Sequence, residues 1–96
     1  MRIKWLSEAV GDLIGIREYI AQDSPASAEG VAGRILSTVD YLRSHPGIGR
    51  AGRVPGTREI IIPGLPYIVP YRVRGNNIEI LGVLHTSRTW PEEGLE

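Results

Sequence analysis

The apolar residues of this chain change their spacing near residue 45, and this change limits the folds that are open to it. Before that point they recur every three or four residues, which is the period of an amphipathic helix. After it they alternate with other residues, which is the period of a strand with one buried face. A chain that carries both periods in this order is expected to pack helices against one face of a sheet.

Two helices are expected in the first half of the chain. The first follows Ser7, a residue type that caps helices, and ends near Gln22. Ser24 and Pro25 then start a second helix, because proline fits the first helical position, and Pro46 stops it. The turn between the helices is short, which predicts an antiparallel hairpin. The apolar stripes consist of Leu6, Val10, Leu13, Ile16 and Ile20, and of Ala28, Val31, Ile35, Val39 and Leu42.

Four strands are expected, a short one at residues 3–5 and three more at 57–62, 67–73 and 77–87. The turn-forming sequences PGLP and RGNN separate the last three, which favours an antiparallel meander. Pro70 has no amide hydrogen to donate, so it indicates a bulge or a locally open edge. The predicted fold class is α+β, with an N-terminal strand and an antiparallel two-helix hairpin packed on one face of a four-stranded, mostly antiparallel sheet.

Alternation also assigns the two faces of this sheet. The residues expected beneath the helices are Tyr67, Val69, Tyr71, Val73, Ile78, Ile80 and Leu84. The residues expected on the opposite face are Ile68, Pro70, Arg72, Arg74, Glu79, Leu81, Val83, His85 and Ser87. Trp90 is expected to close the end of the core. Two helices cover only one face, so the second face is expected to lie open, which is typical of a partner-binding surface.

Composition narrows the class of protein. The 96 residues suit one domain, spanning 1–96 with a short acidic tail at 92–96. The absence of cysteine excludes disulfides and thiol chemistry, and two distant histidines give no metal signature, so we expect no cofactor. No secretory signal is visible, and three prolines break the most apolar stretch, residues 60–70. We therefore expect a cytoplasmic protein that does not enter a membrane.

Positive charge is concentrated in the second half. The whole chain has no net charge, yet residues 49–91 carry six arginines against Glu59 and Glu79. Ten of the eleven basic residues are arginine, which pairs well with carboxylate and phosphate groups. This half is the candidate surface for an anionic partner, although a single surface arginine is most often only solvated.

Four segments, by their order and spacing, resemble a known family. They are LRSHPGIGR, PGTREI, YRV and VLHTSRTWP. With the segments between them, from Ile3 to Pro91, they resemble the RelE/ParE superfamily of bacterial toxins from type II toxin–antitoxin modules, and the ParE-like branch more closely. The resemblance implies the helix-and-sheet fold that the periodicity also predicts. It implies a cognate antitoxin of the ParD or RelB kind, and operator DNA binding only through that antitoxin.

The antitoxin that this resemblance implies folds a disordered C-terminal segment over its toxin. Such a segment can cover a broad apolar face and pair its carboxylates with arginines, Arg88 among them. The residues expected to contact the antitoxin or the target are Arg53, Arg58, Ile68, Arg72, Arg74, Leu81, Val83 and His85.

The two branches of the superfamily differ in their toxic chemistry: ParE-like toxins poison DNA gyrase, and RelE-like toxins cut mRNA on the ribosome. Metal-free RNA cleavage needs a base, an acid and cations at the phosphate. The conditional candidates are Glu59, His85, Arg72 and Arg88. The nuclease branch typically relies on a lysine-rich patch or on a Glu/His pair with a C-terminal Tyr or His, whereas this chain has only Lys4 and the ending TSRTWP. We therefore expect gyrase inhibition; the alternatives are a metal-independent, ribosome-dependent endoribonuclease and an inactive family member that only binds its antitoxin.

Overall fold

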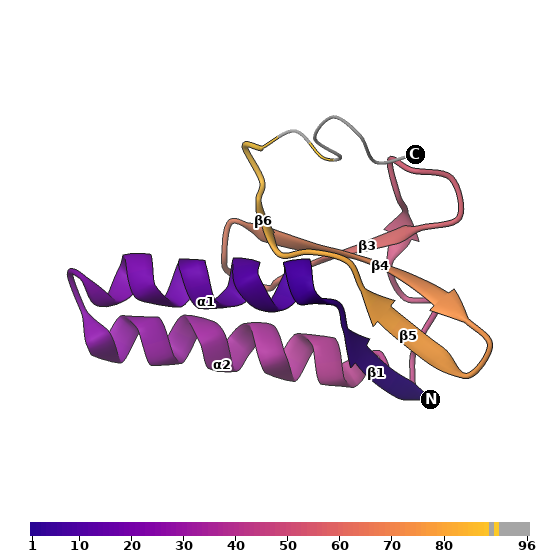
Figure 1. Cartoon of the computed structure of the whole chain (residues 1–96), viewed down its shortest axis with the longest axis horizontal. Helices are drawn as coiled ribbons and strands as arrows, with labels where there is room; N and C mark the ends of the chain where they lie inside the picture. Colours follow the sequence, from indigo (N-terminus) through magenta and orange to yellow (C-terminus); the bar gives the residue numbers. More distant parts are fainter. Residues whose placement is uncertain (89, 91–96) are drawn as a thin grey trace.

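The computed structural model describes residues 1–88 and 90, and within these residues the chain forms two helices and six strands (Figure 1). Both helices precede residue 45, and every strand except the first follows it, as the change in apolar spacing predicts. In chain order the elements are β1 (Arg2–Trp5), α1 (Ser7–Ala21), α2 (Pro25–Tyr41), β2 (Arg50–Ala51), β3 (Arg58–Ile61), β4 (Tyr67–Arg74), β5 (Asn77–Ile80) and β6 (Leu84–His85).

The two helices form the antiparallel hairpin that the apolar stripes predict (Figure 1). α2 begins as expected, because the Ser24 side chain accepts a backbone N–H of the first turn and Pro25 is the first helical residue. The prediction of Ser7 as the N-cap of α1 is wrong, since Ser7 is already helical. The buried stripe of α1 also differs by one residue: Ala9 is fully buried, whereas Val10 is 41% exposed.

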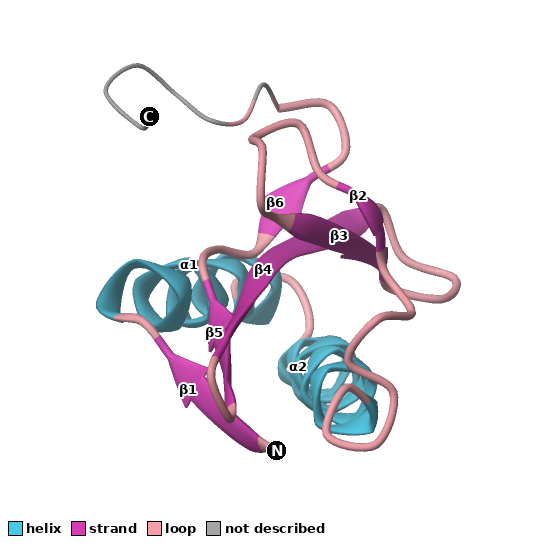
Figure 2. Ribbon diagram, turned by 90° about the vertical axis from the view of Figure 1, so that its right-hand side faces the viewer, coloured by secondary structure: helices cyan, strands magenta, loops and turns pink. Residues whose placement is uncertain are grey.

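The sheet is mixed, so the prediction of a four-stranded, mostly antiparallel sheet is only partly right. Among the described residues it has six strands in the order β1-β5-β4-β3-β2, with β6 paired to β4. β1 runs parallel to β5, and the other pairs are antiparallel. β1 lies at one edge, and β3 and β2 lie toward the other (Figure 2). β2 has only two residues, which is too short for alternation to be read from the sequence.

A β-bulge divides the strand predicted at 77–87 into β5 and β6. The pairing of β4 with β5 reaches Tyr71 and Ile80, and the pairing of β4 with β6 resumes at Ile68 and Leu84. Between these two pairs β4 advances by three residues, from Tyr71 to Ile68, whereas the facing segment advances by four, from Ile80 to Leu84. The facing segment therefore contains one extra residue, as a β-bulge does. An extra residue reverses the alternation of every side chain that follows it.

Two contacts hold this bulge. The carbonyl oxygen of Pro70 accepts the Leu81 N–H at 2.9 Å, but Pro70 has no N–H to return. Asp12 on α1 reaches the same place, where its Oδ2 accepts the Val83 N–H at 3.0 Å. The backbone donor at the bulge is therefore paired. The bulge is one of the two outcomes that Pro70 predicts from the sequence.

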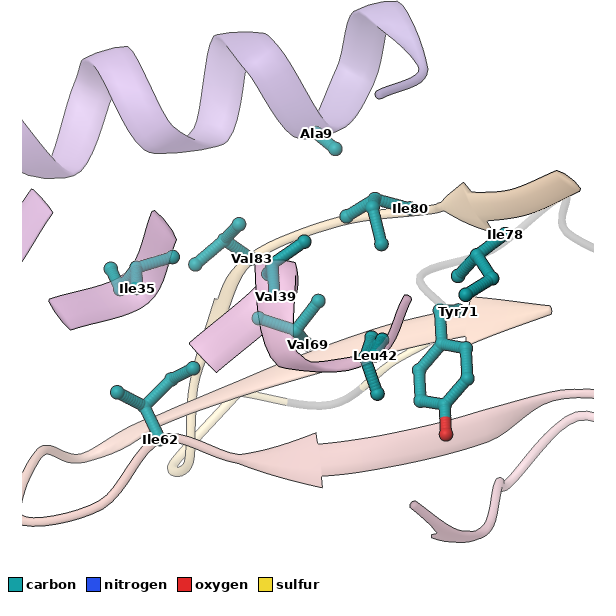
Figure 3. Close-up of a cluster of buried hydrophobic side chains, with 10 residues drawn as sticks. All are labelled: Ala9, Ile35, Val39, Leu42, Ile62, Val69, Tyr71, Ile78, Ile80 and Val83. Atoms are coloured by element: carbon teal, nitrogen blue, oxygen red, sulfur yellow. The ribbon is translucent and has the colours of Figure 1, made fainter. Parts of the chain in front are cut away.

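The core lies between the helices and the sheet face that they cover, here named the inner face (Figure 3). As predicted, it includes Ile35, Val39, Leu42, Val69, Tyr71, Ile78 and Ile80. Three predicted face assignments are wrong because of the bulge: Val83 belongs to this core, Leu84 lies on the opposite, outer face, and His85 lies on the inner side. Val73, which alternation places beneath the helices, is 43% exposed.

The Gly- and Arg-rich loop before β3 is shaped by contacts with the sheet. A Cβ atom on Gly49 would lie 2.7 Å from the Tyr71 ring, and one on Gly52 would collide with Thr57. Both positions therefore require glycine for close approach. No helix within the described residues has the length and apolar character needed to cross a membrane.

Candidate functional site

The apolar part of the outer face is covered by the chain itself. Ile68 (2% exposed), Leu84 and Trp90 (4%) form a buried cluster, against which Val54 and Leu81 pack. Trp90 thus closes an apolar cluster, although this cluster lies on the outer face. The prediction of an open apolar face is wrong at Ile68, which the chain covers with its own side chains.

The bulge turns Val83 and His85 to the inner side of the sheet, so their predicted place on the outer face beside Arg72 is wrong. Val83 is 3% exposed and packs in the core. His85 stays exposed, pairs with Tyr67 across the two strands and stands edge-on to its ring at 5.7 Å. Nδ1 of His85 accepts the Ser87 N–H at 3.1 Å and lies 2.8 Å from the Ser87 hydroxyl. His85 is therefore held by local contacts.

Arg58 has a structural contact on the inner side. Its Nη1 donates to the carbonyl oxygens of Gly47 at 3.2 Å and Gly49 at 2.8 Å. Burial raises the pKa of the nearby Tyr71, and the Gly49 N–H and the charge of Arg58 act in the opposite direction. Arg58 thus holds the loop before β2, and its predicted contact with a partner stays a prediction.

Glu59, the candidate base, lies buried beneath two arginines. It is 2% exposed, and its Oε2 accepts the Arg53 backbone N–H at 3.0 Å. Its carboxylate also forms ion pairs with Arg50 at 3.4 Å and with Arg53 Nε at 3.5 Å. Arg53 Nη1 in turn donates to the Arg88 carbonyl at 3.4 Å. Both carboxylate oxygens are occupied, and a ribose hydroxyl has no access to them.

The accessible part of the outer face is a cationic strip over β1, β5 and β4, which comprises Arg2, Lys4, Arg72, Arg74 and Glu79. The strand register places Lys4, Glu79 and Arg72 side by side, with Arg2 and Arg74 in the next row. Arg72 Nε donates to Glu79 Oε1 at 2.6 Å. This hydrogen bond is the main reason why the pKa of Glu79 lies below its ordinary value. Burial acts to raise this pKa, and the charges of Arg72, Arg74 and Lys4 lower it further. The strip has four cations for one carboxylate.

Sequence reasoning missed Arg2 and Lys4 as members of this strip. Their alternation with Ile3 and Trp5 shows that they share a face, but not which strand lies beside them. Only the parallel pairing of β1 with β5 brings them to Arg72 and its neighbours. That pairing joins segments more than 70 residues apart, and no local signal in the sequence specifies it.

A groove between α2 and β3 was also missed. Its volume is about 440 Å³, and it is lined by Ser37, Thr38, Tyr41, Ile48, Ile60, Ile61 and Pro63. Three of these side chains are about half exposed: Tyr41 (48%), Ile48 (53%) and Ile61 (51%). The period of a helix or strand identifies buried residues, so it gives no signal for apolar residues that stay at the surface.

Three of the four candidate catalytic residues, His85, Arg72 and Glu59, do not converge on one point. The fourth, Arg88, lies next to His85, whose carbonyl oxygen accepts the Arg88 N–H at 3.0 Å. His85 lies on the inner side near Tyr67, whereas Arg72 lies on the outer face five residues along β4, roughly 16 Å away at about 3.3 Å per residue. Glu59 is buried. In the part of the chain that the structure describes, no group of three or more His, Cys, Asp or Glu residues is placed to hold a metal ion. The accessible features are suited to binding.

The fold is that of a small α+β protein whose accessible surface offers charge and apolar contact. The family described as the ParE toxin of type II toxin–antitoxin systems, parDE, matches residues 3–90. This match spans nearly all of the chain and includes both helices and every strand described above, except Arg2, the first residue of β1. The chain belongs to this ParE toxin family.

Individual relatives agree with this assignment. The chain is 42% identical to Y4kP of Sinorhizobium fredii, a protein named as a toxin, over 95% of this chain and 94% of the relative. It is 31% identical to toxin RelE2 of Caulobacter vibrioides, over 91% of this chain and 97% of the relative. Among solved structures, a chain of the chromosomal ParDE toxin–antitoxin system from P. aeruginosa superposes with a TM-score of 0.81 and is 32% identical, covering 88% of this chain and 95% of that one.

Proposed function

We propose that this chain inhibits growth by binding DNA gyrase, that it cuts no RNA, and that a cognate antitoxin neutralises it. Membership of the ParE family supports the toxin role and the antitoxin partner. The observation that carries the choice of target is the separation of the residues that RNA cleavage would need.

Cleavage of RNA without a metal requires a base, an acid and cations within hydrogen-bond reach of one phosphate. In this chain the exposed imidazole of His85 and the guanidinium of Arg72 lie on opposite sides of the sheet. Glu59 is enclosed by its own ion pairs. Undoing the bulge would bring His85 to the face of Arg72 but would leave the two residues five positions apart along β4. This separation supports a toxin that acts by binding.

The surface that remains accessible supports a protein partner. The half-exposed Tyr41, Ile48 and Ile61 offer apolar contact in the groove between α2 and β3. Arg72 and Arg74 offer cations to an acidic antitoxin. We assign antitoxin contact to these two areas, in place of the covered Ile68.

Growth assays with a pair of histidine variants test the absence of nuclease chemistry. We expect His85→Ala to inhibit growth as the wild type does, because binding needs no proton transfer from that ring. His45→Ala is the matched control, since His45 is the other exposed histidine. Primer extension on cellular mRNA should find no toxin-dependent cuts, and co-expression of the antitoxin encoded by the adjacent reading frame should restore growth.

The nuclease alternative makes the opposite prediction. If His85→Ala abolishes growth inhibition while His45→Ala does not, and the wild type produces discrete mRNA cuts, then the chain is a ribonuclease. If the adjacent reading frame does not restore growth, the pairing with that antitoxin is wrong.

A further inference from the structure

β1 is an edge strand with an open side. It occupies one end of the strand order and pairs only with β5 among the described residues (Figure 2). The Arg2 N–H donates to Asn76 at 3.0 Å and the Leu6 N–H donates to Ile80 at 3.1 Å, both toward β5. Because the direction of backbone groups alternates along a strand, the N–H and C=O groups of Ile3 and Trp5 point away from β5. These groups are a template for one more strand.

The side chains along this edge differ between the two faces. Ile3 and Trp5 are partly buried and pack against the core on the inner side. Arg2 and Lys4 are exposed on the outer side, where they continue the cationic strip. A strand added here would place every second side chain beside an apolar residue and the others beside a cation.

We propose that the open edge of β1 accepts an extended segment of the cognate antitoxin as an added strand, and that acidic residues alternate with apolar residues in that segment. The carboxylates would lie beside Arg2 and Lys4, and the apolar side chains beside Ile3 and Trp5. Main-chain hydrogen bonds to the edge give such a complex its affinity, and the alternating side chains give it specificity. This inference rests on the proposed antitoxin pairing and names the chemistry of the segment and its place.

Charge selects this occupant over a second copy of the chain. In a two-fold antiparallel pairing through the outward groups of Ile3 and Trp5, Arg2 or Lys4 of one copy would lie beside Arg2 or Lys4 of the other on the same face. Like charges directly opposite each other destabilise a strand pair. The two rows of the strip also contain four cations and only Glu79 as a carboxylate, so an incoming acidic side chain meets attraction from several cations.

The side chains of the strip also disfavour single-stranded nucleic acid. Proteins that bind such strands combine a cationic groove with aromatic side chains on which bases stack. The strip consists of Arg2, Lys4, Arg72, Arg74 and Glu79 and contains no aromatic ring. The one aromatic residue of β1, Trp5, packs on the inner side. A carboxylate is already bound on this face, since Glu79 Oε1 accepts a hydrogen bond from Arg72 Nε at 2.6 Å.

The test uses the purified toxin and its antitoxin. Arg2→Gln/Lys4→Gln removes two cations from the edge, and Arg17→Gln/Arg43→Gln removes two exposed cations from the helical layer as a matched control. Calorimetric titration should give a dissociation constant raised by roughly two- to thirty-fold for the edge variant, the range expected for the loss of two cross-strand pairs. The control should bind as the wild type does.

Amide hydrogen exchange supplies a backbone readout. In the complex the amides of Ile3 and Trp5 should become protected, whereas those of Arg2 and Leu6, already bonded to Asn76 and Ile80, are protected in both states. An unchanged Ile3 and Trp5 pattern, or equal affinities for the two double variants, overturns the proposal. So does an edge variant that aggregates yet binds normally, because its cations would then act only against edge-to-edge association. If the wild-type toxin does not bind this antitoxin at all, the proposed pairing itself fails.

Discussion

Tyr71 links the core to the loop that precedes the edge of the sheet. Its ring is fully buried, and its hydroxyl donates to the Pro46 carbonyl at 2.8 Å and accepts the Gly49 N–H at 2.9 Å. The hydroxyl is therefore a buried polar group that is hydrogen-bonded both as a donor and as an acceptor. One residue thus explains why glycine is needed at 49 and where the loop is anchored.

Replacing Tyr71 with phenylalanine should destabilise the fold. The change leaves the buried Gly49 N–H and the Pro46 carbonyl without their partner, which is expected to lower the free energy of unfolding by about 1–3 kcal/mol. Urea denaturation measures this loss. Tyr19→Phe is the control, because Tyr19 is 73% exposed. If both variants lose the same small amount, the hydroxyl does not anchor the loop.

The Arg72–Glu79 pair should make stability depend on pH in the acidic range. The pKa of Glu79 is lower in the folded chain than its ordinary value, mainly because of the hydrogen bond from Arg72. The resulting stabilisation is complete above the ordinary glutamate pKa, about 4.3, and is lost as pH falls through the lower, folded pKa.

Urea midpoints between about pH 6 and about pH 3 check this dependence. Glu79→Gln should have a shallower loss of stability on acidification than the wild type, because it has no carboxylate to protonate at that position. Glu18→Gln, at an exposed position of α1, should keep the wild-type slope. Equal slopes for all three proteins would mean that the pair does not couple to folding.

At the scale of the elements, the bulge between β5 and β6 decides which residues can meet. It moves Val83 into the core and places His85 on the inner side. Without the extra residue both would lie on the outer face, where alternation alone predicts them. Asp12 of α1 binds the Val83 N–H and so ties a helix to this irregular point.

Asp12 variants test whether that hydrogen bond maintains the bulge. Asp12→Ala leaves the Val83 N–H without its partner and should cost about 1–3 kcal/mol of unfolding free energy. Asp12→Asn keeps a side-chain oxygen as acceptor and should recover most of the loss. Denaturation curves and the exchange rate of the Val83 amide measure both effects. An Asn variant as unstable as the Ala variant would argue against a simple acceptor role.

Much of the architecture can be predicted from the sequence, because it depends on local periodicity. The helical hairpin, the start of α2 at Ser24 and Pro25, and the strands around 58–61 and 67–74 follow from spacing and turn chemistry. Pro70 even indicates the irregular edge. Pro70 does not indicate how many extra residues the bulge contains. One extra residue is enough to reverse the faces of Val83, Leu84 and His85.

The surface was harder to predict than the core. The arginines of β4 are visible in the sequence, but the cations of β1 join them only through a long-range parallel pair. The covering of Ile68 by Trp90 likewise depends on where the chain runs after β6. Periodicity describes which residues an element buries, and it does not specify which distant segment lies over them.

At the scale of the whole molecule, the accessible features lie at different parts of the sheet. β1 lies at one edge of the sheet, and β3 and β2 lie toward the other (Figure 2). The open side of β1 and the cationic strip that begins there belong to the first edge, and the apolar groove between α2 and β3 belongs to the second. Of the candidate catalytic side chains, Glu59 is buried in its ion pairs, and His85 lies on the inner side, away from the cationic strip. This arrangement favours a toxin that holds a protein target and is itself held by an antitoxin.

The supercoiling reaction of purified DNA gyrase tests the central claim most directly. Relaxed plasmid, gyrase and ATP are incubated with increasing amounts of the toxin, with the toxin bound to its antitoxin as the matched control. The account predicts that supercoiling falls as toxin is added and returns when antitoxin is present. Gyrase activity that stays unchanged at every toxin concentration, together with codon-restricted cuts in ribosome-bound mRNA, would contradict it.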